Sequence, residues 1–257
     1  MTKGKKGAKG RKPSSARATA PPGWIQGDFL PLTVTETDLE DLVTGGLIAE
    51  GSWRLPGKEA EPEPHEDERV LLTTHVERGF SLPPHPFFRG FLNFFGAQLH
   101  HFPPNAIAYL SAYVTFCECF LGCPAHWGLF KHIFTIRSQA VKKANTNDSK
   151  TNVIQLCGGL GLQKRTGSSF PSLSFPDSVR GWQSTWFYCK DVASPNMLTG
   201  LPPFTLARPT APRPLVVSEE EKAAVDTLVS SVVELVQGGV TGLDLLEVFL
   251  SRRIQPL

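Results

Sequence analysis

The sequence predicts an α+β fold that is mainly α: a helical core at about residues 83–137, a small antiparallel sheet at about 153–190, and flanking helices. Three observations carry this prediction. Apolar residues recur at helical spacing through the densest apolar region, short β-branched and aromatic runs follow it, and a capped amphipathic segment lies towards each end. With 257 residues, 40% of them hydrophobic, the chain can build one sizeable domain with tails.

We expect residues 1–23 to form a disordered basic leader, because they have almost nothing apolar to bury. Residues 1–27 contain no acid and seven basic residues: Lys3, Lys5, Lys6, Lys9, Arg11, Lys12 and Arg17. Of the 26 basic residues in the chain, 19 therefore remain against 24 acids. Weak, non-specific nucleic-acid binding is expected mainly through the leader. The same composition also suits a nuclear localisation signal, a solubilising tail or an organelle transit peptide.

The body of the domain is predicted at residues 24–200, and its first helix lies within residues 35–46. Thr37 and Glu40 have the spacing of a capping box, and two glycines end the segment. Its apolar stripe is Leu39, Leu42 and Val43.

A change of composition separates this helix from the next element. Residues 58–69 hold six acids and two prolines, which indicates a solvated linker or a long loop. Val70 to Val76 is rich in β-branched residues and precedes a glycine, which predicts a strand.

Three helices joined by short loops are predicted to form the core. Pro86 suits the first turn of one helix, Pro103-Pro104 starts the second, and Pro124 opens a shorter third. The first helix has a broad apolar face: Phe87, Phe88, Phe91, Leu92, Phe94 and Phe95. Helices so closely connected must pack on one another, which places the core here.

The region after the core predicts strands rather than helices. Residues 138–152 are polar and predict a loop. Three short runs then have strand composition: Val153 to Cys157, Leu173 to Phe175, and Thr185 to Lys190.

A C-terminal helical hairpin is predicted at residues 218–257, after a proline-rich linker at 201–217 that detaches it from the domain. Ser218 and Glu221 form a capping box before the first apolar stripe: Val225, Leu228, Val229, Val232, Leu235 and Val236. The second stripe is Leu243, Leu246, Phe249 and Leu250. The stripes are expected to bury each other and to support self-association through residues 218–254.

The most tempting candidate site is a group of cysteines and histidines: Cys117, Cys119, Cys123, His126 and His132. A zinc site needs four converging ligands, but Cys117 and Cys119 lie about 200° apart on a helix. Buried small side chains explain the cysteines better. We therefore predict no metal site, and the odd cysteine count indicates a reducing compartment rather than a disulfide framework.

Two further motifs also receive structural interpretations. The glycine-rich run Gly158 to Leu162 is followed by a polar, turn-rich segment instead of a helix, which predicts a β-turn and not a phosphate loop. His85 and the His100-His101 pair lie beside prolines at helix boundaries, which favours helix-end packing. No nucleophile in a G-x-S-x-G context accompanies these histidines, so no catalytic residue and no cofactor are predicted.

Several longer runs resemble a known family. They are His85–Gly96, Gln98–Ile107, Cys117–Gly122, His126-Trp127 and Gly181–Asp191, flanked by Thr35–Leu47 and Phe249–Leu257. These segments resemble the gypsy-type transposon domain, also called a transposase domain, that is abundant in grass genomes. The resemblance covers roughly residues 28–200 and extends to the C-terminus, and long runs are more specific than short motifs. It implies association with plant long-terminal-repeat retroelements and supplies no catalytic residues.

The sequence can be compared with the motifs of retroelement enzymes. Asp148 and Asp226 lack the glycine that an aspartic protease requires two residues later, and neither a Tyr-x-Asp-Asp pair nor a nucleocapsid zinc knuckle is present. Glu118 is the single acid between residues 78 and 147, which does not favour an integrase-type acidic triad. We therefore expect a retrotransposon-derived, non-catalytic protein that acts as a structural or protein-interaction module.

Two alternatives belong to other functional classes. One is a nucleic-acid-binding component of a transposition machinery, whose affinity would fall steeply with salt and depend on residues 1–20. The other is a metal-dependent nuclease or strand transferase, which a plasmid-nicking assay would reveal. The partner is expected to be an unknown protein or a second copy. No membrane span is expected, because the longest apolar stretch, Ala106 to Leu121, is interrupted and short. The expected location is the nucleus, otherwise the cytoplasm.

Overall fold

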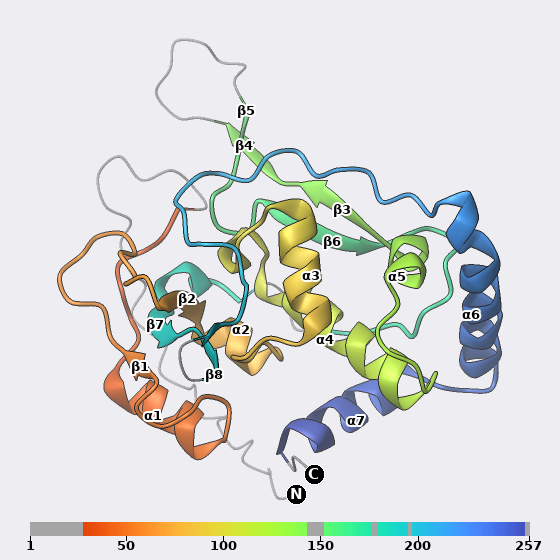
Figure 1. Ribbon diagram of the computed structural model, residues 1–257, viewed down its shortest axis with the longest axis horizontal. Helices are drawn as coiled ribbons and strands as arrows, with labels where there is room; N and C mark the ends of the chain where they lie inside the picture. The colour runs from red at the N-terminus through yellow and green to blue at the C-terminus, as the bar shows by residue number, and fades with distance from the viewer. Residues whose placement is uncertain (1–27, 143–151, 176–178, 195–196, 255–257) are drawn as a thin grey trace, which may run out of the picture.

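The computed structural model describes residues 28–142, 152–175, 179–194 and 197–254 (Figure 1). In this part the chain has seven α-helices and small antiparallel sheets, which confirms an α+β fold with mostly helix. The helices are α1 Glu36–Thr44, α2 Thr73–Glu77, α3 Pro86–Phe95, α4 Pro104–Cys119, α5 Trp127–Ile133, α6 Glu219–Gln237 and α7 Gly242–Ile254, with 3-10 turns η1 Leu99–His101 and η2 Trp182–Ser184. The strands are β1 Trp53–Arg54, β2 Glu68–Leu72, β3 Phe134–Ser138, β4 Ala140–Lys142, β5 Asn152–Ile154, β6 Leu160–Lys164, β7 Trp186–Lys190, β8 Val192–Ser194 and β9 Met197–Leu198.

Two sequence-based expectations concern the N-terminal leader and membrane spans. The predicted leader, residues 1–23, lies outside the described residues. None of the helices in the described ranges is long and apolar enough to cross a membrane.

The N-cap of the first helix lies two residues earlier than predicted. Thr35 is the N-cap, and its hydroxyl accepts from the backbone N–H of Asp38 while the Asp38 carboxylate accepts from the backbone N–H of Thr35. The predicted Thr37–Glu40 capping box is therefore wrong. Thr35 has extended backbone angles (φ −109°, ψ 167°), as an N-cap requires, whereas Thr37 is already helical. Leu39 and Leu42 are buried as predicted.

A three-stranded sheet in the order β1-β7-β2 joins the two ends of the main domain. Val70 pairs with Tyr188 in the antiparallel register of β2 and β7. The predicted strand from Val70 to Val76 is wrong beyond Leu72, because α2 starts at Thr73. Four successive α2 side chains, from Thr73 to Val76, are buried, and this tertiary burial overrides the strand preference of β-branched residues.

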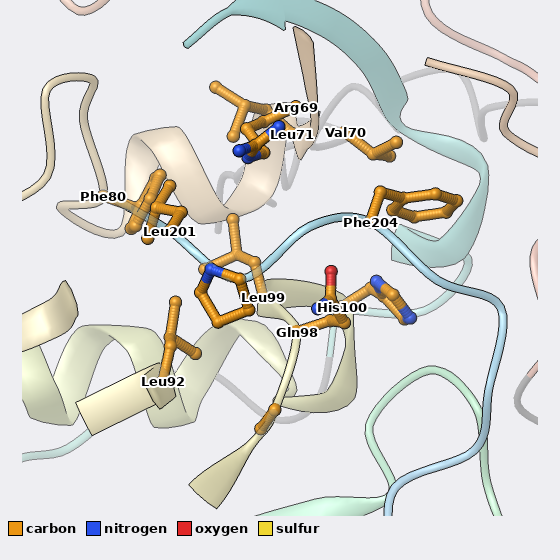
Figure 2. Close-up of a pocket in the computed structure, with 12 residues that line it drawn as sticks. Arg69, Val70, Leu71, Phe80, Leu92, Gln98, Leu99, His100, Leu201 and Phe204 are labelled. Atoms are coloured by element: carbon orange, nitrogen blue, oxygen red, sulfur yellow. The ribbon is translucent and has the colours of Figure 1, made fainter. Parts of the chain in front are cut away.

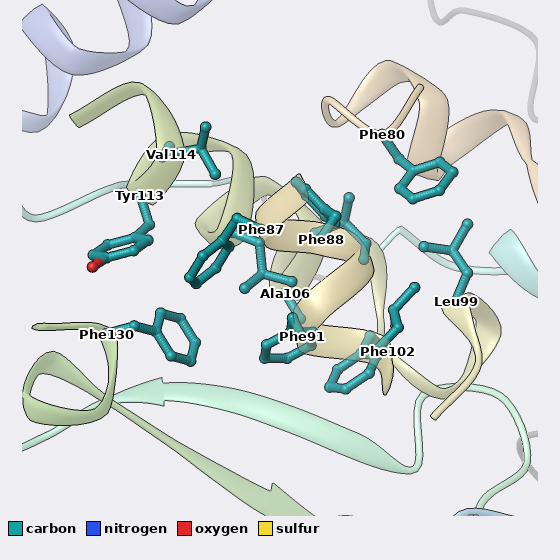
Figure 3. Packing of buried hydrophobic residues seen from close by; sticks show 14 of the residues in the cluster. Phe80, Phe87, Phe88, Phe91, Leu99, Phe102, Ala106, Tyr113, Val114 and Phe130 are labelled. Carbon is teal, nitrogen blue, oxygen red and sulfur yellow. The ribbon is translucent and has the colours of Figure 1, made fainter. Parts of the chain in front are cut away.

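The core is formed by α3, α4 and α5, as the sequence predicted (Figure 3). The ring of Phe91 on α3 is fully buried and contacts those of Phe102 and Phe130. Tyr113 on α4 contacts Phe87 and Phe130, so aromatic side chains join all three helices. Edge-to-face contacts of this kind add about 0.5–1.5 kcal/mol per pair to the free energy gained by burial.

Two details of the predicted core are wrong. The third helix does not open after Pro124 but begins at Trp127, with His126 as its N-cap. Residues 83–137 are also not wholly helical, because β3 starts at Phe134. In β3, Phe134 and Ile136 are buried and Thr135 between them is less so, which is the alternation of a half-buried strand.

The predicted single sheet at 153–190 is also wrong. Its strands pair with partners from elsewhere in the chain: β5 with β4, β6 with β3, and β7 with β1 and β2. The predicted loop at 138–152 contains β4 and the first residue of β5, and the interval 143–151 lies outside the described residues. The predicted strand Val153 to Cys157 ends at Ile154, and Leu173 to Phe175 is not a strand. Residue composition identified extended segments in this region, but which strands pair with one another depends on residues far away in the sequence.

Residues 199–217, which we call the strap, run across the core from the β7 region to α6 (Figure 1). The side chain of Gln98 donates to the main-chain oxygen of Pro203, and Arg165 donates to that of Leu215. Leu201 and Leu215 are buried. The prediction that the proline-rich segment detaches the C-terminal helices is therefore wrong, because hydrogen bonds and apolar burial fix the segment to the core.

The C-terminal helices pack on the core instead of on each other. The predicted Ser218–Glu221 capping box is present. The main partner of α6 is α5 and that of α7 is α4, so the predicted mutual burial of the two stripes is wrong. In α7, Leu245 is fully buried, whereas Leu243, the first residue of the predicted stripe, is 66% exposed. The buried face of α7 therefore differs from the predicted one. Contact with α4 decides which face of α7 is buried.

Candidate functional site

The predicted basic site cannot be placed by this structure. All seven leader residues lie outside the described residues. The other candidates fall within the described ranges, where their local geometry can be examined.

The cysteines and histidines predicted not to bind zinc serve the packing of α4 and α5. Cys117 is fully buried and Cys119 is exposed, in agreement with their predicted opposite positions on the helix. Burial raises the pKa of the Cys117 thiol to about 11, so it is protonated at neutral pH. The ring Nδ1 of His126 accepts from the backbone N–H of Leu129 and caps α5. In the described ranges, no group of three or more His, Cys, Asp or Glu side chains is arranged to hold a metal ion.

The glycine-rich run forms a turn that leads directly into β6. Gly158 has a φ of 75°, and its N–H donates to the main-chain oxygen of His100 at 2.8 Å. The strand β6 follows the glycines, whereas in a phosphate loop the glycines lead directly into the N-terminus of a helix. The predicted turn is correct at Gly158-Gly159, but Leu160 to Leu162 belong to β6.

His85 connects three helices. Its Nδ1 accepts from the backbone N–H of Phe87, which caps α3, and its Nε2 lies 2.9 Å from Glu118 Oε1 on α4. The second carboxylate oxygen of Glu118 accepts from Arg252 of α7 at 2.8 Å. Since Nδ1 is an acceptor, Nε2 carries the proton and donates it to Glu118. Both ring nitrogens are therefore engaged, and the predicted role at a helix end is correct.

A cluster of three buried histidines is the most unusual chemical feature of the core. His75 from α2 and the pair His100 and His101 from η1 are each at most 2% exposed. The rings of His100 and His101 lie 4.5 Å apart between centroids. His75 Nε2 donates to the main-chain oxygen of Phe102 at 2.9 Å.

His101 connects η1 to the strap through both ring nitrogens. Its Nδ1 accepts from the backbone N–H of Gln98 at 3.0 Å, and its Nε2 donates to the main-chain oxygen of Ala207 at 3.1 Å. Burial lowers the pKa values of His75 and His101 to about 4. It also lowers the pKa of His100 well below the usual value for histidine. All three are therefore neutral at pH 7.

A cavity of about 20 Å³ lies beside this cluster, between the strap and β2 (Figure 2). Arg69, Gln98 and His100 supply its polar lining, and Leu201 and Phe204 of the strap cover it. Such a volume holds roughly one water molecule and no substrate. Within the described residues, His100 Nε2 has no hydrogen-bond partner.

The ion pair next to the cavity escaped sequence analysis. The Arg69 guanidinium lies 2.7 Å from the Asp191 carboxylate, which is fully buried and also accepts from the Thr199 hydroxyl. Arg69 closes the acidic loop and Asp191 follows an aromatic strand more than a hundred residues later. No local pattern marks the pair, because only the β2–β7 pairing brings the two residues together.

Comparison with family models shows what this core is related to. Residues 70–138 match the family described as "Putative gypsy type transposon". These residues form a gypsy-type transposon domain. No curated protein and no solved structure matches the chain.

The gypsy-type transposon domain comprises β2, the helices α2 to α5, and β3. It contains all three histidines of the buried cluster together with His85 and Glu118. The partners of these residues lie partly outside it: Ala207 in the strap accepts from His101, and Arg252 in α7 pairs with Glu118. The flanking segments therefore complete the polar contacts of the domain.

Proposed function

We propose that this chain is a non-catalytic, retroelement-derived protein that serves as a structural or protein-interaction module. The observation that carries the proposal is how the histidines of the transposon domain are used. His85, His101 and His126 accept from backbone N–H groups that begin helical turns, and His75 donates to a backbone carbonyl. A general base needs a free ring nitrogen that faces a reacting group, and these four rings hold the backbone in place instead. Among the described residues His100 Nε2 has no hydrogen-bond partner, but the cavity beside it holds roughly one water molecule and no substrate.

The acids of the core support the same proposal. Glu68, Asp191 and Glu118 are each paired with an arginine: Arg54, Arg69 and Arg252, respectively. Metal-dependent phosphoryl transfer needs carboxylates that converge on a shared ion. Carboxylates that are each neutralised by their own arginine suit a scaffold better than a nuclease or strand transferase.

We further propose a second copy of the chain as the partner, with contact through residues 218–254. Although the helices dock on the core, Leu243 and Leu250 of α7 are 66% and 50% exposed. Both lie on the outward side of a helix whose other face covers α4. Large apolar side chains so exposed on one helix can be buried by a like surface.

Sedimentation of the full chain over a range of concentrations tests the interaction. We expect concentration-dependent association in the unaltered chain and loss of it in Leu243→Lys with Leu250→Lys. Leu206→Lys, at a site 37% exposed on the strap, is the matched control and should leave association unchanged. Monomers at every concentration would refute self-association, and nicking of supercoiled plasmid with magnesium or manganese would refute the non-catalytic proposal.

A nucleic-acid-binding role in a transposition machinery is the second candidate. It is favoured by seven basic residues within the first 17 positions of a chain that also carries a transposon domain. The same leader is proposed as a nuclear localisation signal. Binding that weakens steeply with salt and disappears on deletion of residues 1–20 would support the first role. A fluorescent fusion that reaches the nucleus only with the leader would support the second.

A further inference from the structure

We propose that the antiparallel ribbon formed by β3 with β6 and by β4 with β5 is a binding surface for duplex DNA. We call residues 134–142 and 152–164 the ribbon. This surface goes beyond the proposed function, in which any nucleic-acid binding is assigned to the basic leader. It is also separate from the leader, which lies at the other end of the domain sequence.

The ribbon has one apolar face and one polar face. Phe134, Ile136 and Leu160 are buried against the core. Thr135 lies opposite Gln163, and Arg137 lies opposite Gly161. Opposed residues of an antiparallel pair share a face, so Thr135, Arg137 and Gln163 belong to the outward face. Gly161 on the same face is buried, and a Cβ there would lie 2.7 Å from the side-chain nitrogen of Gln139. Arg137 and Gln163 are exposed, as is Gln139 two residues beyond Arg137.

The charge of this region is positive and uncompensated. The described residues 134–142 and 152–165 contain four basic residues, Arg137, Lys142, Lys164 and Arg165, and no acid. Of these, Arg137 is exposed on the outward face, whereas Lys164 lies opposite the buried Phe134 and its Nζ donates to the main-chain oxygen of Phe170. Among the described residues, no carboxylate forms an ion pair with Arg137, Lys164 or Arg165. Arg165 donates instead to main-chain oxygens, among them those of Lys131 and Phe134, so its charge is held in place at the base of the ribbon.

Acids are concentrated elsewhere in the molecule. Residues 36–68 hold eleven acidic residues and two basic ones. They include α1, β1 and the start of β2; in Figure 1, α1 lies at the bottom and β4 and β5 at the top, with β1 and β2 between them. This asymmetry repels a polyanion from one side and orients it towards the ribbon.

The shape of the ribbon favours a duplex. Figure 1 shows β4 and β5 at the periphery, beyond the helices. From Phe134 to Lys142 the ribbon is at most about 26 Å long, at ~3.3 Å per residue. The major groove of B-form DNA is about 12 Å wide and admits a two-stranded ribbon, whereas the major groove of an RNA duplex is too narrow. Arginine and glutamine side chains suit phosphate oxygens and base edges.

The test uses the full chain with the seven basic leader residues replaced by glutamine, so that the leader does not dominate binding. A fluorescent, mixed-sequence DNA duplex is titrated at several salt concentrations. Arg137→Glu should weaken binding by about fivefold or more at low salt and reduce the salt slope by about 1. Gln163→Glu, on the same face, should also weaken binding, and Arg137→Lys should largely preserve it.

Two exposed positions far from the ribbon provide matched controls. Lys190→Glu on β7 has the same charge change as Arg137→Glu, and Gln237→Glu at the end of α6 matches Gln163→Glu. Both should bind as the parent does. If the ribbon variants bind no more weakly than these controls, the proposal is wrong. Equal affinity for an RNA duplex or for single-stranded DNA also overturns the duplex assignment. Neither result bears on self-association, which sedimentation decides.

Discussion

The imidazole of His101 donates a hydrogen bond to the main-chain oxygen of Ala207, 3.1 Å away, and so fixes the strap to the core. The donor lies inside the gypsy-type transposon domain, and the acceptor lies about seventy residues after its end. Nδ1 of the same ring accepts from the backbone N–H of Gln98, which only a neutral imidazole can do, so protonation would remove the contact that orients the ring towards Ala207. The attachment of the strap is therefore sensitive to protonation of this histidine.

Acidification should destabilise the protein between about pH 6.5 and 4. His75 and His101 have pKa values lowered from 6.5 to about 4 by burial, so the unfolded chain binds protons that the folded chain excludes. The contribution of the two neutral rings to the free energy of unfolding is fully present above pH 6.5 and is lost as the pH falls towards 4. Each should lower the free energy of unfolding by about 2 kcal/mol between pH 7 and pH 5. Urea titrations at the two pH values measure this loss, and His101→Gln should reduce it.

Phe91→Ala should destabilise the protein by roughly 3–5 kcal/mol. The side chain is fully buried, and its ring contacts those of Phe95, Phe102 and Phe130. Phe94→Ala removes the same ring from the same helix at a site 36% exposed, and should cost much less. Denaturant midpoints of the two variants provide the comparison. Equal losses would mean that α3 does not present the described face to the core.

Gly79→Ala should be far more damaging than Gly239→Ala. Both glycines have positive φ, 109° and 102°, so both substitutions add backbone strain of about 1–3 kcal/mol. A Cβ at Gly79 would lie 2.2 Å from Ser111 Oγ on α4, whereas a Cβ at Gly239 meets nothing within 4 Å. The difference in thermal midpoint between the two variants measures the cost of the steric clash at Gly79, where the chain after α2 lies close to α4. Similar midpoints would show that the two helices can separate without cost.

The protein should purify without stoichiometric zinc, and chelators should not unfold it. Cys117 is buried and protonated while Cys119 is exposed on the other side of α4, so the two thiols cannot share one ion. Elemental analysis together with circular dichroism in chelator is the measurement. One tightly held zinc per chain would contradict both the spacing argument and the described geometry.

Much of the local structure was determined by the sequence alone. Pro86 at the start of α3, Pro104 at the start of α4 and the Ser218–Glu221 capping box were all predicted from residue type and spacing. Helical periodicity also identified Phe91 and Leu92 as buried. These features depend on interactions within a few residues of one another, which the order of the sequence makes visible.

Tertiary structure decided the rest. Cross-strand pairing brings Arg69 to Asp191, and docking on α4 buries Leu245 in place of Leu243. A hydrogen bond from His101 to Ala207 fixes the proline-rich segment to the core. Local patterns did not distinguish these outcomes, because each residue's partner lies tens to more than a hundred positions away. The free energy of burial and pairing depends on which distant segment packs against an element, and the periodicity of that element does not identify the segment.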